Sequence, residues 1–194
     1  MGTGETQTDR YLMNETPNNS GHEPQVLAWG IDPGITGAIA RVFFTDEGKP
    51  FVRVWDMPTV LVGKKKVISP YLCAEILDMK EWSPFQLIRG SSVLIERVGA
   101  MPGQGVTSMF RFGEAYGIIK GVLGGLRLPV ELVSPAVWKR AMKVQKGKES
   151  SRLRALELFP EQTELFKLKK DHGRADAALI ALYNCIEKTP YEEI

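Results

Sequence analysis

The chain has little of what would mark a disulfide-rich or membrane-spanning protein. Its 194 residues include two cysteines, Cys73 and Cys185, both in apolar, helical-looking contexts, which argues against a disulfide framework or a cysteine metal site. No apolar run is long enough to cross a bilayer. The glycines do not follow a strand as GxGxxG, so no nucleotide cofactor is expected. What remains is the composition of an ordinary globular domain.

The first 25 residues differ from the rest. They carry four acidic side chains and one basic one, with neither the apolar core of a signal peptide nor the arginine-rich character of a transit peptide. We expect 1–25 to be a disordered leader or a tail added for expression, 26–187 to be one domain, and 188–194 to be a short C-terminal tail. Beyond the leader, 24 basic residues face 19 acidic ones, a mild excess that permits a polyanionic partner.

Hydrophobic periodicity predicts strands first, then alternating helices and strands. Runs at 26–31, 38–44 and 51–56 are separated by turn residues and predict three antiparallel strands, followed by a loop at 64–66. Further strands are predicted at 92–96 and 129–133. Helices are predicted at 69–80, 107–126, from Ser134-Pro135 onward, 149–159 and 174–186. This order predicts an α/β domain with a mixed sheet flanked by helices.

Carboxylates end two of the predicted strands. Asp32 closes the apolar run in VLAWGIDPGITGAIA and Glu96 closes SVLIE, while KKDHGRADAALIALY places His172 and Asp176 on one helical face. Carboxylates held together repel one another unless a cation lies between them. Oxygen donors with an imidazole suit Mg²⁺ or Mn²⁺. Two such ions about 4 Å apart can activate water and stabilise the leaving oxygen in phosphodiester cleavage.

Each of these residues has a plainer explanation when taken alone. Asp32 begins an ordinary Asp-Pro-Gly turn, Glu96 could pair with Arg97, and His172 could cap its helix. Asp176 is more telling, because it interrupts an otherwise apolar helix. The four residues in this order therefore indicate a metal-binding active site more strongly than any one of them does alone.

Three segments carry a family resemblance. GIDPGITGAIA, VLIERVGAMPGQGVTSMFRFGEAYG and KKDHGRADAALIALY, in this order and spacing, resemble the RuvC-type Holliday junction resolvases over roughly residues 26–186, and most closely the branch that includes the plant chloroplast resolvase and its bacterial and phage-like relatives. The resemblance implies a ribonuclease H-like fold, a homodimer and symmetric cleavage of four-way DNA junctions with Mg²⁺ or Mn²⁺, two ions per active site. It implies the following catalytic and metal-binding set: Asp32, Glu96, His172 and Asp176.

The last motif departs from the common bacterial pattern. There the third ligand stands three residues before the final acid, a position that Gly173 occupies here, whereas His172 stands four before it. Either the helix begins differently or Asp171 contributes. His172 would then serve as a ligand or as a base that orients water.

Basic and aromatic side chains are candidates to hold DNA. By the resemblance, the glycine-rich loop after Glu96 faces the junction, and Met101 and Phe110 are candidates to stack on bases, with a core position as the alternative for each. Lysines and arginines near the site would contact phosphates, with a solvated positive face as the alternative. These DNA-binding candidates are Lys139, Arg140, Lys143, Lys146, Lys167, Lys169 and Lys170.

The predicted helix 107–126 carries Gly113, Gly117 and Gly121 at a spacing of four. Glycine costs about 1 kcal/mol relative to alanine inside a helix, so a close neighbour is the expected compensation. We expect this helix either to cross the sheet or to build the dimer contact. A two-fold dimer would match a substrate in which two opposed strands are cut.

The sequence thus predicts a structure-selective DNA endonuclease that binds four-way junctions, needs no membrane, and lies in the chloroplast stroma or nucleoid if its source is a plant or alga, and otherwise in the bacterial cytoplasm. The alternative is a branched-DNA-binding protein without catalysis. A third hypothesis takes GIDPGITGA as a sugar-kinase-type phosphate loop, but those proteins need two such domains to close over ATP, and 194 residues are too few.

Overall fold

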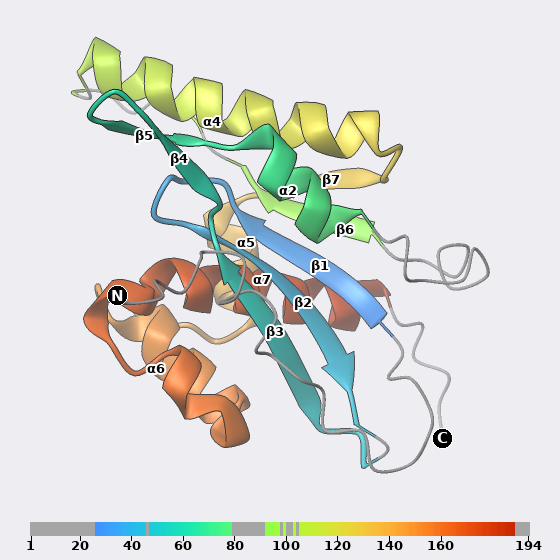
Figure 1. Cartoon of the computed structure of the whole chain (residues 1–194). Helices are drawn as coiled ribbons and strands as arrows, with labels where there is room; N and C mark the ends of the chain where they lie inside the picture. Colours follow the sequence, from blue (N-terminus) through green and yellow to red (C-terminus); the bar gives the residue numbers. More distant parts are fainter. Residues whose placement is uncertain are drawn as a thin grey trace, which may run out of the picture.

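The computed structural model describes residues 26–45, 47–78, 92–97, 99, 103 and 105–188. Its centre is a five-stranded sheet in the order β3-β2-β1-β6-β7, with a separate β4-β5 hairpin (Figure 1). The strands are β1 (Val26–Asp32), β2 (Ala38–Phe44), β3 (Pro50–Asp56), β4 (Thr59–Val62), β5 (Lys65–Ile68), β6 (Ser92–Glu96) and β7 (Val130–Val133). The helices are α2 (Pro70–Leu77), α4 (Val106–Gly125), α5 (Pro135–Ala141), α6 (Ser150–Leu158) and α7 (His172–Lys188), with 3-10 turns η1 (Pro160–Leu165) and η2 (Lys169–Asp171).

The sheet is mixed, as the order of elements predicted. β1 pairs antiparallel with β2, and β2 pairs antiparallel with β3, whereas β1–β6 and β6–β7 are parallel. Ile31 lies opposite Ile95 in the parallel pair, so Asp32 and Glu96 come next on adjacent central strands. Successive side chains of a strand point to opposite faces, and both carboxylates therefore share the face of Ala28 and Leu94.

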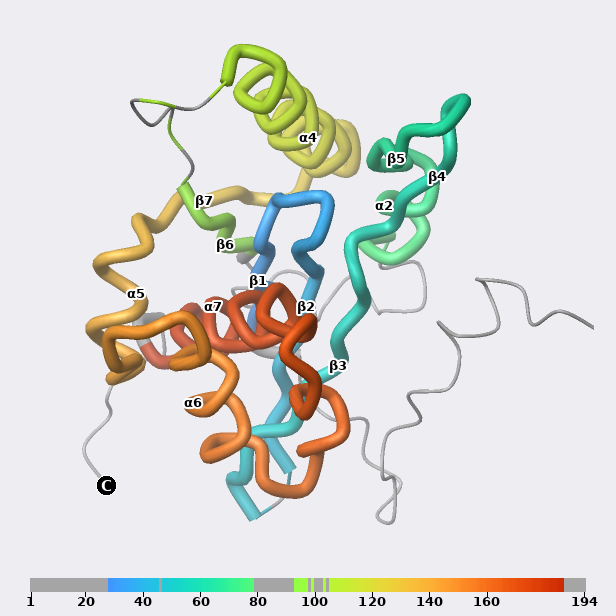
Figure 2. The backbone as a smooth tube through the Cα atoms, turned by 90° about the vertical axis from the view of Figure 1, so that its left-hand side faces the viewer, coloured from blue at the N-terminus to red at the C-terminus, as the bar shows by residue number. Residues whose placement is uncertain are grey.

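Helices cover both faces of the sheet (Figures 1 and 2). One face packs against α5, α6 and α7. The residues of α7 between Ala175 and Cys185 supply much of a buried cluster on this face. The other face packs against α2 and α4, which contribute Cys73, Leu77, Ile119 and Leu123 to a second cluster. No helix in the described part of the chain is long and apolar enough to cross a membrane.

The backbone of α7 packs directly against the backbone of β1, because β1 has a glycine, Gly30, at its middle. A Cβ atom on Gly30 would lie 2.2 Å from the Ala181 nitrogen and 2.4 Å from the Ala177 carbonyl oxygen. A glycine inside an otherwise apolar strand is the sequence signal for such an approach. The contact fixes how near the first turns of α7 come to the end of β1.

The structure corrects two local predictions. The loop predicted at 64–66 is wrong for Lys65 and Lys66, which lie in β5 and pair with β4. Gly63, at φ +62°, and Lys64 form a two-residue connection that suits a tight hairpin. The helix predicted over 69–80 ends at Leu77, with Ser69 accepting a hydrogen bond from the Leu72 N–H as its N-cap, and 79–80 lie outside the described residues.

Gly30→Ala should destabilise the protein, because the added methyl group meets backbone atoms of α7 that cannot rotate away. We expect the free energy of unfolding to fall by about 1–3 kcal/mol or more, measured by urea denaturation. Gly124→Ala is the matched control: Gly124 is an exposed helical residue with no atom within 4 Å of the position that a Cβ would take, so this change should be neutral or stabilising by up to about 1 kcal/mol. Equal effects of the two changes would contradict the close packing of α7 on β1.

Candidate active site

The four residues predicted to carry the chemistry come together where the two central strands β1 and β6 end. Asp32 and Glu96 end β1 and β6, and His172 and Asp176 lie in the first turns of α7. The pKa of Asp32 is affected by the charges of Asp176, Glu96 and His172, which places all four groups within electrostatic reach of one another. Residues far apart in the sequence therefore form one polar cluster.

Two glycines allow the start of α7 to reach the β1–β2 turn. A Cβ atom on Gly173 would lie 2.3 Å from the Thr36 carbonyl oxygen. A Cβ atom on Gly37 would lie 2.2 Å from the backbone carbonyl oxygen of Asp32. Gly173 therefore has no room for a side chain of any kind. By the resemblance, this is the position of the third ligand in the common bacterial pattern, and a ligand here would require the start of α7 to move.

Asp32 is held by its own turn. The backbone N–H of Gly34 donates to Oδ1 of Asp32 at 3.3 Å. Burial, and then the charges of Asp176 and Glu96, raise the pKa of Asp32 to about 7, against the opposing effects of the Gly34 hydrogen bond and of His172. Near neutral pH this carboxyl is thus poised between its two forms unless a cation joins the cluster.

Glu96 accepts a hydrogen bond from a buried tryptophan of α5. The indole Nε1 of Trp138 donates to Oε1 of Glu96 at 3.0 Å. Burial raises the pKa of Glu96, and the Trp138 hydrogen bond opposes that effect. The charge of Asp176 raises this pKa further, and that of Lys139 lowers it.

Asp176 has one carboxylate oxygen without a partner. Its Oδ1 atom is buried and accepts no hydrogen bond from the residues that the structure describes. Burial raises the pKa of Asp176, while a hydrogen bond from Ser151, at the start of α6, and the charges of Lys139 and His172 lower it. A buried carboxylate oxygen left without a donor is costly, and a bound cation is the usual reason for keeping one.

The contacts of Asp171 are structural, and they are made outside the cluster of Asp32, Glu96 and Asp176. Its buried carboxylate accepts the Leu168 N–H at 2.8 Å, and its other oxygen lies 3.8 Å from Arg174. Arg174 also donates two hydrogen bonds to the carboxylate of Asp56, at the end of β3, from Nε at 2.5 Å and from Nη2 at 2.7 Å. These contacts anchor the start of α7 to the sheet. His172, by contrast, is exposed and free to face a substrate.

The side chains of the cluster have the chemistry of a divalent metal site, although they are not arranged as one. Among the described residues, no group of three or more His, Cys, Asp or Glu side chains is placed so that it could hold a metal ion. The chemistry of the cluster nevertheless suits one. Three carboxylates are hard oxygen donors and an imidazole adds a nitrogen donor, all three carboxyl pKa values are raised, and Oδ1 of Asp176 lacks a partner among the described residues. A cation would reverse those raised pKa values by balancing the clustered negative charge.

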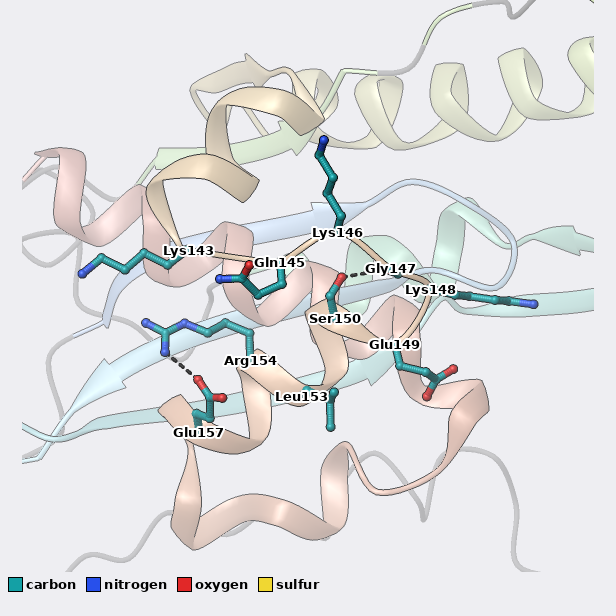
Figure 3. Close-up of a pocket in the computed structure, with 10 residues that line it drawn as sticks. All are labelled: Lys143, Gln145, Lys146, Gly147, Lys148, Glu149, Ser150, Leu153, Arg154 and Glu157. Carbon is teal, nitrogen blue, oxygen red and sulfur yellow. Dashed lines mark hydrogen bonds and ion pairs between the residues drawn. The ribbon is translucent and has the colours of Figure 1, made fainter.

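The predicted DNA-binding residues lie in three places. Lys139 is beside the cluster, with its Nζ 5.0 Å from the ring centroid of Trp138. Lys143 and Lys146 border a hollow of about 580 Å³ between the end of α5 and α6, together with Lys148 (Figure 3). These three lysines extend in different directions from its rim, which suits an extended polyanion better than a single small anion.

The remaining basic candidates are exposed. Arg140 lies in the last turn of α5, and Lys169 and Lys170 form η2 directly before α7. Lys167 is paired with Glu164 at 2.6 Å. Phe110 is 73% exposed near the start of α4, so a core position is excluded for it. Met101 lies outside the described residues.

Sequence reasoning missed two side chains that contact the carboxylates. Trp138 and Ser151 come from α5 and α6, which reach the site only because those helices pack on the same sheet face as α7. Their sequence contexts, PAVWKRA and SSRLRALEL, give no sign of a polar contact to a distant residue. The glycine in VLAWGID was the one signal available for the close approach of α7.

Comparison with known proteins defines the fold as that of RuvC. T. thermophilus RuvC, solved in complex with a Holliday junction substrate, aligns with a TM-score of 0.51 over 80% of this chain and 90% of that one, at 19% identity. The ribonuclease H-like mixed sheet flanked by helices is thereby confirmed.

Among curated proteins, the chain is similar to the chloroplastic Holliday junction resolvase MOC1 of Chlamydomonas reinhardtii. The two are 29% identical over 154 residues, which is 68% of this chain and 17% of that protein, so the chain spans about a sixth of its relative's length. The resemblance drawn from the three sequence motifs is confirmed by this match. No protein-family model matches the chain.

The acidic cluster should make the metal-free protein less stable as the pH rises. The pKa of Asp32 is raised from 3.8 to about 7 on folding, so its stabilising effect is complete below pH 3.8 and is lost as the pH rises toward 7. Asp32→Asn removes this titration. The difference in Tm between Asp32→Asn and wild type, both in EDTA, should therefore grow in favour of the variant across that interval and level off above it.

Adding Mg²⁺ above pH 7 should raise the Tm of the wild-type protein and have little effect on Asp32→Asn, because a ligand that binds only the folded state stabilises it. In the EDTA experiment, a Tm difference between Asp32→Asn and wild type that does not depend on pH would show that Asp32 does not titrate within this cluster.

Proposed function

We propose that this protein is a structure-selective DNA endonuclease that resolves four-way junctions by symmetric, metal-dependent phosphodiester hydrolysis. The observation that carries the proposal is the cluster of Asp32, Glu96 and Asp176, with raised pKa values and one unpartnered buried oxygen, on the edge of a RuvC-like sheet. Carboxylates next to a phosphodiester would weaken binding unless a metal ion intervened. The cluster therefore argues against the alternative of a branched-DNA-binding protein without catalysis.

The names of the similar proteins support the same activity. MOC1 is named a Holliday junction resolvase, and the RuvC structure contains a Holliday junction substrate. Because the chain matches only 17% of MOC1, we carry the activity over as a proposal that rests on the residues of this chain. The relative is chloroplastic, which supports a plastid location if this chain comes from a plant or an alga.

In this mechanism Asp32, Glu96 and Asp176 would hold Mg²⁺ or Mn²⁺, with two ions per site expected and His172 available as a further ligand. The bound metal would supply Lewis acidity to the phosphate and acidify a water molecule. His172, whose side chain is exposed, would either complete the ligand set or serve as the base that orients that water. Lys139, whose charge already acts on Glu96 and Asp176, would lie where charge develops on the phosphate.

The lysines near the site would hold the arms of the junction. Lys143 and Lys146 border the hollow between the end of α5 and α6, and Lys169 and Lys170 lie in η2, directly before α7. Contacts of this kind go to phosphates and carry no sequence information. Junction affinity should accordingly fall as salt concentration rises.

A homodimer would place two such sites on one junction, and α4 is the element we propose for the contact. Its glycines Gly113, Gly117 and Gly121 are exposed, and within the described part of the chain no atom lies within 4 Å of a Cβ placed on them. The opposite side of α4, with Ala115, Ile119 and Leu123, packs on the sheet. The neighbour expected for the glycine row is thus absent from the described part of the chain, which supports a second copy as that neighbour.

Asp32→Asn should abolish cleavage and spare binding. We expect cleavage of a synthetic four-way junction in Mg²⁺ to fall by at least about 10³-fold, since a ligand to the metal is lost, while junction affinity measured by gel shift in Ca²⁺ or EDTA changes little. Linear duplex with the same arms serves as the substrate control. Cleavage at the wild-type rate would remove Asp32 from the mechanism, and junction binding by the wild type without nicks in either Mg²⁺ or Mn²⁺ would favour the non-catalytic alternative.

Gly117→Arg should separate the dimer without unfolding the monomer, because the side chain enters open space in the single chain. Light scattering after size-exclusion chromatography should show a dimer for wild type at micromolar concentration and a monomer for the variant, with unchanged far-UV circular dichroism. Thr163→Arg, on the exposed surface of η1, is the control and should remain dimeric. A Gly117→Arg dimer would move the contact away from α4.

A further inference from the structure

Trp138 makes two contacts at once, and both lead to the carboxylate cluster. It is fully buried in α5, and its indole N–H donates to Oε1 of Glu96 at 3.0 Å. The face of the same ring carries the ammonium group of Lys139 at 5.0 Å from its centroid. A side chain without any charge of its own thus contacts both an acid and a base of the site.

The hydrogen bond constrains Glu96 in a way that packing alone would not. A carboxylate at the end of a strand can rotate about several bonds, and an N–H donor to Oε1 fixes which oxygen remains available to a ligand. Loss of a group that hydrogen-bonds to a metal ligand typically weakens metal binding by about 10- to 100-fold. Because Trp138 is packed in the buried cluster with Met142, Ala155 and Phe166, its own position is fixed.

The ring face constrains Lys139 in the same way. A cation over an indole ring is attracted by the ring's electrons, most strongly where water is excluded. Lys139 acts on both Glu96 and Asp176. Its place over Trp138 therefore keeps a positive charge beside two acids without a direct ion pair that would occupy their oxygens.

We propose that Trp138 is a positioning residue of the metal site: its N–H presents one oxygen of Glu96 to a divalent cation, and its ring holds Lys139 next to that oxygen. The proposal rests on the metal-dependent activity proposed above and deepens it by naming a residue outside the carboxylate set. Trp138 would touch neither the metal nor the DNA.

The chain contains a matched control for the loss of an indole N–H. Trp29 in β1 is also fully buried, and among the described residues its Nε1 has no hydrogen-bond partner. It lies in the cluster on the opposite face of the sheet, stacked on Trp55 at 5.9 Å between ring centroids. Trp→Phe at each position removes similar volume, but only Trp138→Phe removes a hydrogen bond to the site.

The test is Mn²⁺ binding in the absence of DNA. Binding is measured by the decrease of the electron paramagnetic resonance signal of the free ion. Trp138→Phe should bind Mn²⁺ about 10-fold more weakly than wild type, and Trp29→Phe within about twofold of it. In junction cleavage, Trp138→Phe should need a correspondingly higher Mn²⁺ concentration for half-maximal rate and recover most of its rate at saturating metal. A purely structural role would affect both variants alike, and equal Mn²⁺ affinity of the two would overturn the proposal.

The outcome also separates this proposal from the proposed function. If wild type cuts no junction but Trp138→Phe still weakens Mn²⁺ binding, the nuclease activity is wrong and the positioning role stands. If wild type cuts junctions and the two variants behave alike, the positioning role is wrong and the nuclease stands. Wild type that binds no Mn²⁺ would overturn the positioning role as well.

A second measurement does not depend on the folding of Trp138→Phe. In ¹⁵N-labelled wild-type protein, the indole N–H resonance of Trp138 should shift when Mg²⁺ is added, and should move upfield in Glu96→Gln, which weakens the acceptor. The Trp29 resonance should stay unchanged in both experiments. A Trp138 resonance that responds to neither change would overturn the proposal.

Discussion

The architecture of the site depends on one close contact, the packing of α7 directly on β1. Gly30 lets the helix backbone lie against the strand, and Gly173 lets the first turn of the helix rest on the β1–β2 turn. The clamp between Arg174 and Asp56 holds that first turn to the end of β3. Because the helix is rigid, these contacts fix where His172 and Asp176 lie relative to Asp32. A side chain at either glycine would lift the helix and open the cluster.

The same contact creates an electrostatic problem that the surrounding helices partly offset. Three carboxylates are drawn together in a half-buried place, and burial and mutual repulsion raise their pKa values. Each acid has its own neutral hydrogen-bond donor: the Gly34 N–H for Asp32, the Trp138 indole for Glu96 and the Ser151 hydroxyl for Asp176. Neutral donors orient a carboxylate while leaving its charge uncompensated. This arrangement supports the proposed cation site, because it orients the carboxylates without an internal ion pair.

The two faces of the sheet differ in the side chains that they carry. The face covered by α5, α6 and α7 carries the acids and their hydrogen-bond donors, whereas the face covered by α2 and α4 is apolar, and α4 is open along its glycine row. The proposed division places chemistry on one side and assembly on the other. Strand β1 serves both, since Trp29 and Ile31 point into one cluster while Ala28 belongs to the other.

The sequence alone determined the order of the elements, the mixed sheet and the identity of the four candidate site residues, because periodicity and motif spacing are local properties of the chain. The glycine in the apolar run of β1 was a further local signal of a close approach, but no prediction was drawn from it. Local pattern could not show that Trp138 and Ser151 reach the carboxylates, that Asp171 is occupied by the Leu168 N–H, or that Phe110 is exposed. Those facts depend on how α4, α5 and α6 pack on the sheet, and contacts between residues distant in sequence exist only once the tertiary structure has brought them together.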